Sequence, residues 1–248
     1  MIKVAVCGAN GRMGKTVVNA VNNSNDMEIV ACIDIAGGEY NSIDDASKNK
    51  KIDVLVDFTQ PNSIYENAKY CLTNGINIVI GTTGLSDAQI EELKNLSQSN
   101  KTSCLIAPNF STGAVLMMMF AKMAAKYFDN AEIIELHHNQ KKDAPSGTAI
   151  KTAQMMAESN DNFASGNCLE TETIEGSRGG TSYNNIHIHS VRMPGFMASQ
   201  EVIFGSLGQT LRIRHDSSDR ECYMPGVLMA IRYVVENGGF VYGLDNIL

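Results

Sequence analysis

The chain has 248 residues, of which 44% are apolar and 19% charged, so it can form one large or two modest globular domains. Its formal net charge of −7 and the absence of any Lys/Arg block longer than two residues argue against nucleic acid or an anionic membrane as the main partner. No apolar run in the sequence approaches the roughly 20 residues that a membrane span needs.

Short apolar segments alternate with helical patterns over the first 110 residues. The predicted strands are 2–7, 27–33, 53–58, 77–80 and 103–107, and the predicted helices are 11–23, 61–73 and 86–97. Pro61 stands at a favoured first-turn position of its helix, and Ser86 forms a capping box with Gln89. This alternation predicts an α/β fold with a doubly wound parallel sheet.

The pattern changes near Asn109. The later segments are predicted as a helix over 112–128, a strand over 133–138, a helix over 147–158, a polar loop over 160–183, strands over 185–191, 200–205 and 209–215, and a helix over 220–236. Three successive strands indicate an antiparallel or mixed sheet. We therefore predict a nucleotide-binding domain formed by 1–110 and 218–248, with an inserted α+β domain at 111–217.

The six cysteines are far apart and form no Cys-x-x-Cys pair. They are Cys7, Cys32, Cys71, Cys104, Cys168 and Cys222. This spacing is typical of reduced thiols, and the first residues show no signal-peptide pattern, so we expect a cytoplasmic protein.

A glycine-rich loop joins the first predicted strand to the first predicted helix. It consists of Gly8, Ala9, Asn10, Gly11, Arg12, Met13 and Gly14. Glycines there allow a tight turn and let the backbone approach a pyrophosphate at the helix N-terminus. Asp34 follows Gly14 by 20 residues and ends the second strand, where an acidic residue binds ribose hydroxyls. The alternative is an ordinary strand-to-helix turn, but the glycine motif, its place between a strand and a helix, and the acidic residue all favour a dinucleotide site.

The residues after Asp34 bear on the choice of cofactor. Ile35 and the Ala-Gly-Gly that follows it offer no cation for a 2′-phosphate. A carboxylate without a neighbouring cation disfavours NADPH, so we expect NADH to be preferred over NADPH.

Two further loops follow predicted strands at the edge of the sheet where ligands bind. They contain Gly81, Thr82, Thr83 and Gly84, and Ala107, Pro108, Asn109, Phe110 and Ser111. Small and hydroxyl side chains there would let a nicotinamide ring pack closely, although ordinary turns remain an alternative for each loop.

The run from Glu135 to Thr148 places proton donors beside an anion site. His137 and His138 close a predicted strand, and Lys141 lies just beyond them. Reduction of a C=C or C=N bond needs a hydride and a proton, which a His or Lys can deliver. Ser146, Gly147 and Thr148 then begin a helix whose unpaired N–H groups suit a carboxylate. These features indicate a reductase of a small carboxylate-bearing substrate; a solvated loop with a capping serine is the plainer alternative.

Two other patterns have structural explanations. His187 and His189 alternate along a strand, but no third ligand of matching spacing accompanies them, so we expect half-buried strand histidines and no metal site. The Met117–Met119 run is expected to be helix core.

At these residues the chain resembles the 4-hydroxy-tetrahydrodipicolinate reductase (dihydrodipicolinate reductase) family of diaminopimelate/lysine biosynthesis. The segments that carry the resemblance are 8–14, 81–84, 107–111, 135–149, 189–192 and 209–220, with Gly226 after them. The resemblance implies a Rossmann-like cofactor domain and a central domain that binds a cyclic dicarboxylate and builds a homotetramer.

The resemblance also implies roles for single residues. His137 would be the acid/base residue and Lys141 the proton donor, while His138, Lys141, Gly147 and Thr148 would hold the substrate. The cofactor would contact the 8–13 loop, Asp34, the 81–83 loop and the 107–110 loop. The chain departs from the family at Ile35, where many members carry a basic residue, and at Ser199, where relatives often have His.

Two other functions share parts of this sequence pattern. Another two-domain NAD(P)-dependent enzyme, such as an aspartate dehydrogenase, is disfavoured by the pairing of His-His-x-x-Lys with Pro-Ser-Gly-Thr, and turnover of aspartate would reveal it. A nucleotide-sensing regulator needs a DNA-binding surface that this acidic chain does not supply, and DNA binding without turnover would reveal that function.

Overall fold

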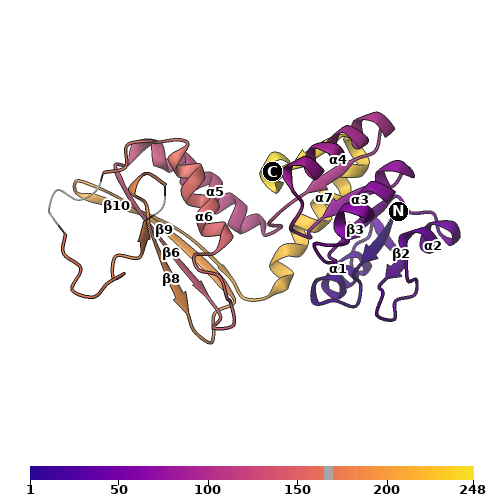
Figure 1. The fold of residues 1–248 in the computed structure, drawn as a ribbon, viewed down its shortest axis with the longest axis horizontal. Helices are drawn as coiled ribbons and strands as arrows, with labels where there is room; N and C mark the ends of the chain where they lie inside the picture. The colour runs from indigo at the N-terminus through magenta and orange to yellow at the C-terminus, as the bar shows by residue number, and fades with distance from the viewer. Residues whose placement is uncertain (165–169, 182) are drawn as a thin grey trace. The chain divides into compact units, whose positions relative to one another are not determined.

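The computed structural model describes residues 1–164, 170–181 and 183–248. These residues form two compact units, one made of Met1–Thr112 with Arg220–Leu248 and the other of Gly113–Asp219 (Figure 1). Cys168 and part of the predicted polar loop lie outside the described residues.

The first unit is built on a parallel sheet of six strands in the order β11-β5-β4-β3-β1-β2. Its strands are β1 (Ile2–Cys7), β2 (Met27–Ile33), β3 (Val54–Asp57), β4 (Asn77–Ile80), β5 (Cys104–Ile106) and β11 (Phe240–Tyr242). The order runs outward from β1 in both directions, so the carboxyl ends of β1 and β3 are neighbours at one edge of the sheet. The predicted doubly wound α/β fold is confirmed.

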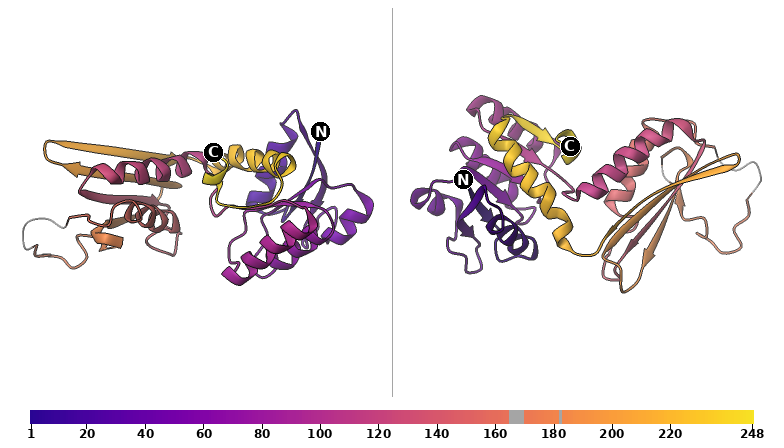
Figure 2. Two further views of the ribbon diagram at one scale, coloured as in Figure 1. Left: turned by 90° about the horizontal axis from the view of Figure 1, so that it is seen from above. Right: turned by 180° about the vertical axis from the view of Figure 1, so that it is seen from behind.

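Helices cover both faces of this sheet. They are α1 (Arg12–Asn22), α2 (Ile43–Asn49), α3 (Ile64–Thr73), α4 (Asp87–Asn100) and α7 (Met224–Glu236). Figure 2 shows α7 and α4 on opposite sides of the strands. Val4 and Val6 of β1 point to one face and Ala5 to the other, and all three are fully buried. Burial on both faces explains why the strands are continuously apolar.

The element boundaries differ from the sequence expectation at a few places. Pro61 lies in a turn before α3, because the N–H groups of Ser63 and Ile64 both donate to the carbonyl of Gln60 and regular helix begins only at Ile64. The predicted helix over 112–128 ends as α5 (Thr112–Ala124) and continues as a short 3₁₀ turn. The capping box of α4 is present as predicted.

The second unit holds a mixed sheet of five strands in the order β10-β9-β6-β8-β7, in which β6 and β8 are parallel and the other pairs antiparallel. Its elements are β6 (Asn130–His137), α6 (Gly147–Ala157), β7 (Gly180–Thr181), β8 (His187–Arg192), β9 (Ala198–Ser206) and β10 (Gln209–Ser217). The helices α5 and α6 lie together along this sheet (Figure 1).

One face of the mixed sheet forms the core of the second unit. Ile133, Val202 and Phe204 are fully buried there against alanines of α5 and α6. Met117 and Met118 of α5 are buried, as expected for helix core, whereas Met119 is only half-buried. The parallel pairing of β6 with β8 brings the ends of these two strands side by side, next to the start of α6.

Candidate functional site

The glycine loop forms a tight turn between β1 and α1. Gly8 has a φ of +80°, and a Cβ atom there would lie 2.6 Å from the carbonyl oxygen of Phe58. A Cβ atom at Gly14 would lie 2.1 Å from the carbonyl oxygen of Gly8, so both positions require glycine. The first turn of α1 contains no acidic residue and Gly11 provides no side-chain cap. Its N–H groups therefore form a site suited to a phosphate.

Asp34 links this loop to the end of β2. Its Oδ2 atom accepts a hydrogen bond from the backbone N–H of Asn10 at 2.9 Å, and its Oδ1 atom accepts one from the backbone N–H of Ala36 at 2.9 Å. The side chain of Asn10 donates in turn to the carbonyl oxygen of Ala36 at 3.1 Å. A carboxylate has about four acceptor positions, so Asp34 retains capacity for ribose hydroxyls.

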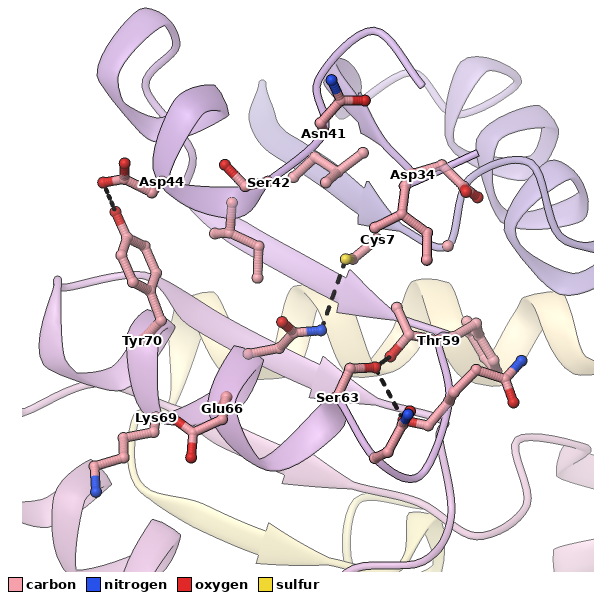
Figure 3. Close-up of a pocket in the computed structure, with 18 of the residues that line it drawn as sticks. Cys7, Asp34, Asn41, Ser42, Asp44, Thr59, Ser63, Glu66, Lys69 and Tyr70 are labelled. Carbon is pink, nitrogen blue, oxygen red and sulfur yellow. Dashed lines mark hydrogen bonds between the residues drawn. The ribbon is translucent and has the colours of Figure 1, made fainter. Parts of the chain in front are cut away.

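A cleft of about 950 Å³ opens beside Gly8, Gly11 and Asp34. Figure 3 shows Asp34 and Ser42 on one side of the cleft and Thr59 and Ser63 on the other. Several lining residues were not predicted from the sequence, namely Asn41, Ser42, Asp44, Thr59, Gln60, Ser63 and Asn67. Some of them could have been predicted from their position directly after β3, because β3 is parallel to β1 and ends at the same edge of the sheet.

A buried carboxylate that was also not predicted from the sequence organises the neighbouring loops. Asp57 at the end of β3 is fully buried. Its Oδ1 atom accepts hydrogen bonds from the hydroxyls of Thr59 and Thr82, both at 2.7 Å, and its Oδ2 atom accepts one from the side chain of Asn67 at 2.8 Å. The Thr82 hydroxyl is therefore used within the protein, whereas Thr83 is exposed.

The other two predicted cofactor loops differ in what they expose. A Cβ atom at Gly81 would lie 2.1 Å from the ring of Phe58, so the backbone passes directly over that ring. In the loop after β5, Ala107 and Phe110 are buried. The ring centroids of Phe110 and Phe58 lie 5.9 Å apart. Pro108 is exposed and Asn109 is half-buried. At the start of α1, Arg12 is exposed and Met13 is half-buried.

In the second unit, His137 pairs with a buried carboxylate. The Nδ1 atom of His137 lies 2.5 Å from Oε2 of Glu135, whose side chain is fully buried. Arg192, from the neighbouring strand β8, donates to both oxygens of Glu135, at 2.9 Å and 2.6 Å. The backbone N–H of Ser146 donates to Oε1 at 3.2 Å. Burial raises the pKa of Glu135, but the hydrogen bonds from His137 and Arg192 outweigh burial and hold the pKa at about 2.

Lys141 lies in the loop after β6 and pairs with a second carboxylate. Its ammonium group lies 2.8 Å from each oxygen of Asp143. The Lys141 hydrogen bond is the main reason that the pKa of Asp143 is lowered. His138 shapes the same loop, because its ring Nδ1 accepts from the N–H of Gln140 and its carbonyl accepts from the N–H of Lys141, both at 3.2 Å.

The loop ends at the N-terminus of α6. Ser146 is the N-cap, and its hydroxyl accepts a hydrogen bond from the N–H of Ala149 at 3.2 Å. Gly147 is exposed, and open space surrounds the position where its Cβ atom would stand. The N–H groups of Gly147 and Thr148 precede the first intrahelical hydrogen bond, so they can bind an anion.

His187 and His189 have structural partners. His189 Nε2 lies 2.8 Å from Oε2 of Glu132, and His187 Nδ1 lies 2.9 Å from the carbonyl oxygen of Arg178. Both rings are half-buried, as expected. Within the described ranges, no group of three His, Cys, Asp or Glu side chains could hold a metal ion, and no helix is long and apolar enough to cross a membrane.

The glycine turn of β1–α1 and the acid at the end of β2 define a Rossmann-type dinucleotide-binding fold. The family model described as "Dihydrodipicolinate reductase, N-terminus" matches residues 2–110, and the model for the C-terminus of the same enzyme matches residues 113–248. The chain belongs to the dihydrodipicolinate reductase family.

Individual relatives match over the full length. The 4-hydroxy-tetrahydrodipicolinate reductase of Gloeothece citriformis is 49% identical, with 100% of this chain and 98% of the relative covered. That of Listeria innocua is also 49% identical, with both chains fully covered. The structure of dipicolinate-bound dihydrodipicolinate reductase from Paenisporosarcina sp. TG-14 is 44% identical, covers both chains fully and superposes with a TM-score of 0.93.

Proposed function

We propose that the chain is an NAD(P)H-dependent oxidoreductase that reduces 4-hydroxy-tetrahydrodipicolinate to tetrahydrodipicolinate in diaminopimelate/lysine biosynthesis. The observation that carries this proposal is the full-length match, at 44% identity, to a reductase whose structure holds dipicolinate. The reaction consumes a hydride and a proton and releases the substrate hydroxyl as water. The chain offers a nucleotide site in its first unit and proton-carrying side chains beside an anion site in its second.

The first unit fits a dinucleotide. The pyrophosphate fits against the N–H groups at the start of α1, where Gly8 and Gly14 leave room for close approach, and the ribose hydroxyls fit the free acceptor positions of Asp34. When bound, a reduced nicotinamide supplies the hydride. Residues 81–83 and 107–110 complete the proposed cofactor contacts. Within the first of these loops, the Thr82 hydroxyl bonds Asp57 and so holds the loop in position.

NADH is the preferred cofactor in this proposal. The cleft beside Asp34 is lined by two further carboxylates, Asp44 and Glu66. Among the described residues that line the cleft, Lys69 carries the sole positive charge, and Glu92 pairs with it at 3.1 Å. A 2′-phosphate would therefore meet an acidic surface, whereas ribose hydroxyls would meet acceptors.

The substrate site is formed by Lys141, His138 and the start of α6. One carboxylate of a cyclic dicarboxylate binds the N–H groups of Gly147 and Thr148, and the ammonium group of Lys141 binds the same substrate. His137 and Lys141 carry the proton that the reduction needs. Because Asp143 already holds Lys141 at 2.8 Å, the Lys141 ammonium is positioned before the substrate arrives.

A homotetramer in the cytoplasm completes the proposal. The face of the mixed sheet opposite α5 and α6 carries the half-buried apolar residues Ile134, Val191 and Ile203, which a second subunit could cover. Cys7, Cys71 and Cys104 are buried free thiols, as suits a reducing compartment. Light scattering of the purified protein measures the assembly, and a monomer at micromolar concentration would contradict it.

The activity is tested by following oxidation of NADH and of NADPH with enzymatically generated substrate. We expect turnover that depends on the substrate, and no turnover with aspartate and NAD⁺. Oxidation of neither nucleotide by correctly folded protein would remove the proposed activity.

A further inference from the structure

Glu135 is linked to all three parts of the proposed substrate site, to two of them directly and to the third through Arg192. Through Oε2 it holds the ring of His137, and through Oε1 it accepts the N–H of Ser146, the cap of the α6 anion site. Its partner Arg192 also donates from Nη2 to the carbonyl oxygen of Asp143, the residue that holds Lys141. These contacts connect one buried carboxylate to the proton carrier, the anion site and the cation loop.

The charge on Glu135 decides which ring nitrogen of His137 carries the fixed proton. Two hydrogen bonds from Arg192, at 2.9 Å and 2.6 Å, keep Glu135 ionised, and an ionised carboxylate only accepts hydrogen bonds. The Nδ1 atom of His137 must therefore be the donor. Nε2 has no hydrogen-bond partner among the residues that the structure describes, and it is the nitrogen left to exchange a proton.

We infer that Glu135 and Arg192 form a positioning pair that fixes the tautomer of His137 and sets it relative to the anion site at α6. The inference rests on the proposed function, because it assigns how the proton carrier of that reaction is held. Neither residue need touch the substrate; both act through His137, Ser146 and Asp143.

The same strand contains a matched control. Glu132 lies on β6 three residues before Glu135, on the opposite face of the sheet, and it also contacts one histidine and one arginine. His189 lies 2.8 Å and Arg178 2.7 Å from its oxygens. Glu132→Gln therefore removes a similar ionic group from the same strand without touching His137.

The first measurement uses the wild-type protein and needs no substrate. NMR of ¹⁵N-labelled histidine, assigned with a His137→Gln variant, should show neutral His137 with its proton on Nδ1. A dominant proton on Nε2 would overturn the inference directly. Since this readout does not involve turnover, it stands apart from the proposed activity, which would fail instead if the folded wild type did not oxidise NADH or NADPH with substrate.

The second measurement compares variants. In Glu135→Gln one end of the amide becomes a donor that faces other donors, so the Nδ1-protonated fraction should fall and kcat should drop by about 10²-fold, with the NADH dissociation constant within about twofold of wild type. Glu132→Gln should keep wild-type kcat. Equal kcat in the two variants would overturn the inference.

A conservative change guards against loss of fold. Arg192→Lys keeps the charge but loses the two-pronged contact, so it should remain folded and show a kcat between those of wild type and Glu135→Gln. If Glu135→Gln proves unfolded by circular dichroism, the Arg192→Lys result decides: lowered kcat with an unchanged NADH dissociation constant supports the pair, and wild-type kcat refutes it.

Discussion

The carboxylate of Asp34 accepts a hydrogen bond from the backbone N–H of Asn10 at 2.9 Å, so the acid at the end of β2 and the glycine loop after β1 hold each other in place. The residue that should select the ribose thus also braces the turn that should hold the pyrophosphate. Ile35, next to Asp34 and lining the same cleft, is 92% exposed and offers no charge.

Cofactor preference follows from this arrangement. Wild type should show a higher kcat/KM with NADH than with NADPH, and Ile35→Arg should shift the ratio toward NADPH by about tenfold or more, because a guanidinium can pair with the 2′-phosphate. Ile35→Gln, which adds length without charge, is the control. A wild-type enzyme that clearly favours NADPH would contradict the account of Asp34 and Ile35.

The two neighbouring threonines after β4 should behave differently. The Thr82 hydroxyl bonds the buried Asp57, and Thr83 is exposed. Thr82→Val leaves Asp57 with one donor fewer and should lower the free energy of unfolding by about 1–3 kcal/mol. Thr83→Val should leave stability within about 0.5 kcal/mol and weaken NADH binding, because residue 83 is one of the proposed cofactor contacts. Urea unfolding and NADH titration of both variants check this; equal loss of stability would be inconsistent with the Asp57 network.

Local spacing in the sequence predicted the tight glycine turn after β1, the position of Asp34 at the end of β2 and the Ser86 capping box of α4. These features depend on residues close in sequence or on a standard interval between strands. The Asp57 network was not predicted because its donors come from three segments. The contact of Arg192 with Glu135 was not predicted because the two residues are 57 positions apart and meet only when β8 pairs with β6. The helix α2 was missed because its seven residues bury only Ile43 and Ala46.

Acid should weaken the fold partly through Glu135. Its folded-state pKa of about 2 lies below the ordinary value of 4.5, so its ionisation stabilises the fold above about pH 4.5, and this contribution is lost as the pH falls toward 2. In that window the unfolding free energy of Glu135→Gln should depend less on pH than that of wild type. Glu236→Gln, at an exposed position on α7, should keep the wild-type slope. Urea unfolding at several pH values measures the slopes, and parallel curves for all three proteins would contradict the argument.

Lys141 should matter for substrate and not for cofactor. Lys141→Ala removes the ammonium group that Asp143 positions, so kcat should fall by about 10²-fold or more and the substrate KM should rise, while the NADH dissociation constant stays near wild type. The adjacent, exposed Lys142 provides the control, since Lys142→Ala should change neither constant appreciably. If NADH binding weakened as much as turnover in Lys141→Ala, the proposed role of this lysine would be wrong.

The open space at Gly147 offers the most direct test of the anion site. Nothing lies within 4 Å of the position that a Cβ atom would take there, so the fold itself tolerates a side chain. A bound carboxylate, however, would have to approach the N–H groups of Gly147 and Thr148 through this space.

Pyridine-2,6-dicarboxylate should therefore inhibit wild type competitively against substrate. Gly147→Val should lose most of this inhibition, and Gly147→Ala, with its smaller side chain, should lose part of it. Thermal unfolding temperature and NADH binding should be close to wild type in both variants. Calorimetric titration with the dicarboxylate gives the affinities, and a crystal structure gives the position. Full inhibition of Gly147→Val, or a dicarboxylate bound away from Lys141 and Thr148, would place the substrate carboxylate elsewhere than at the start of α6.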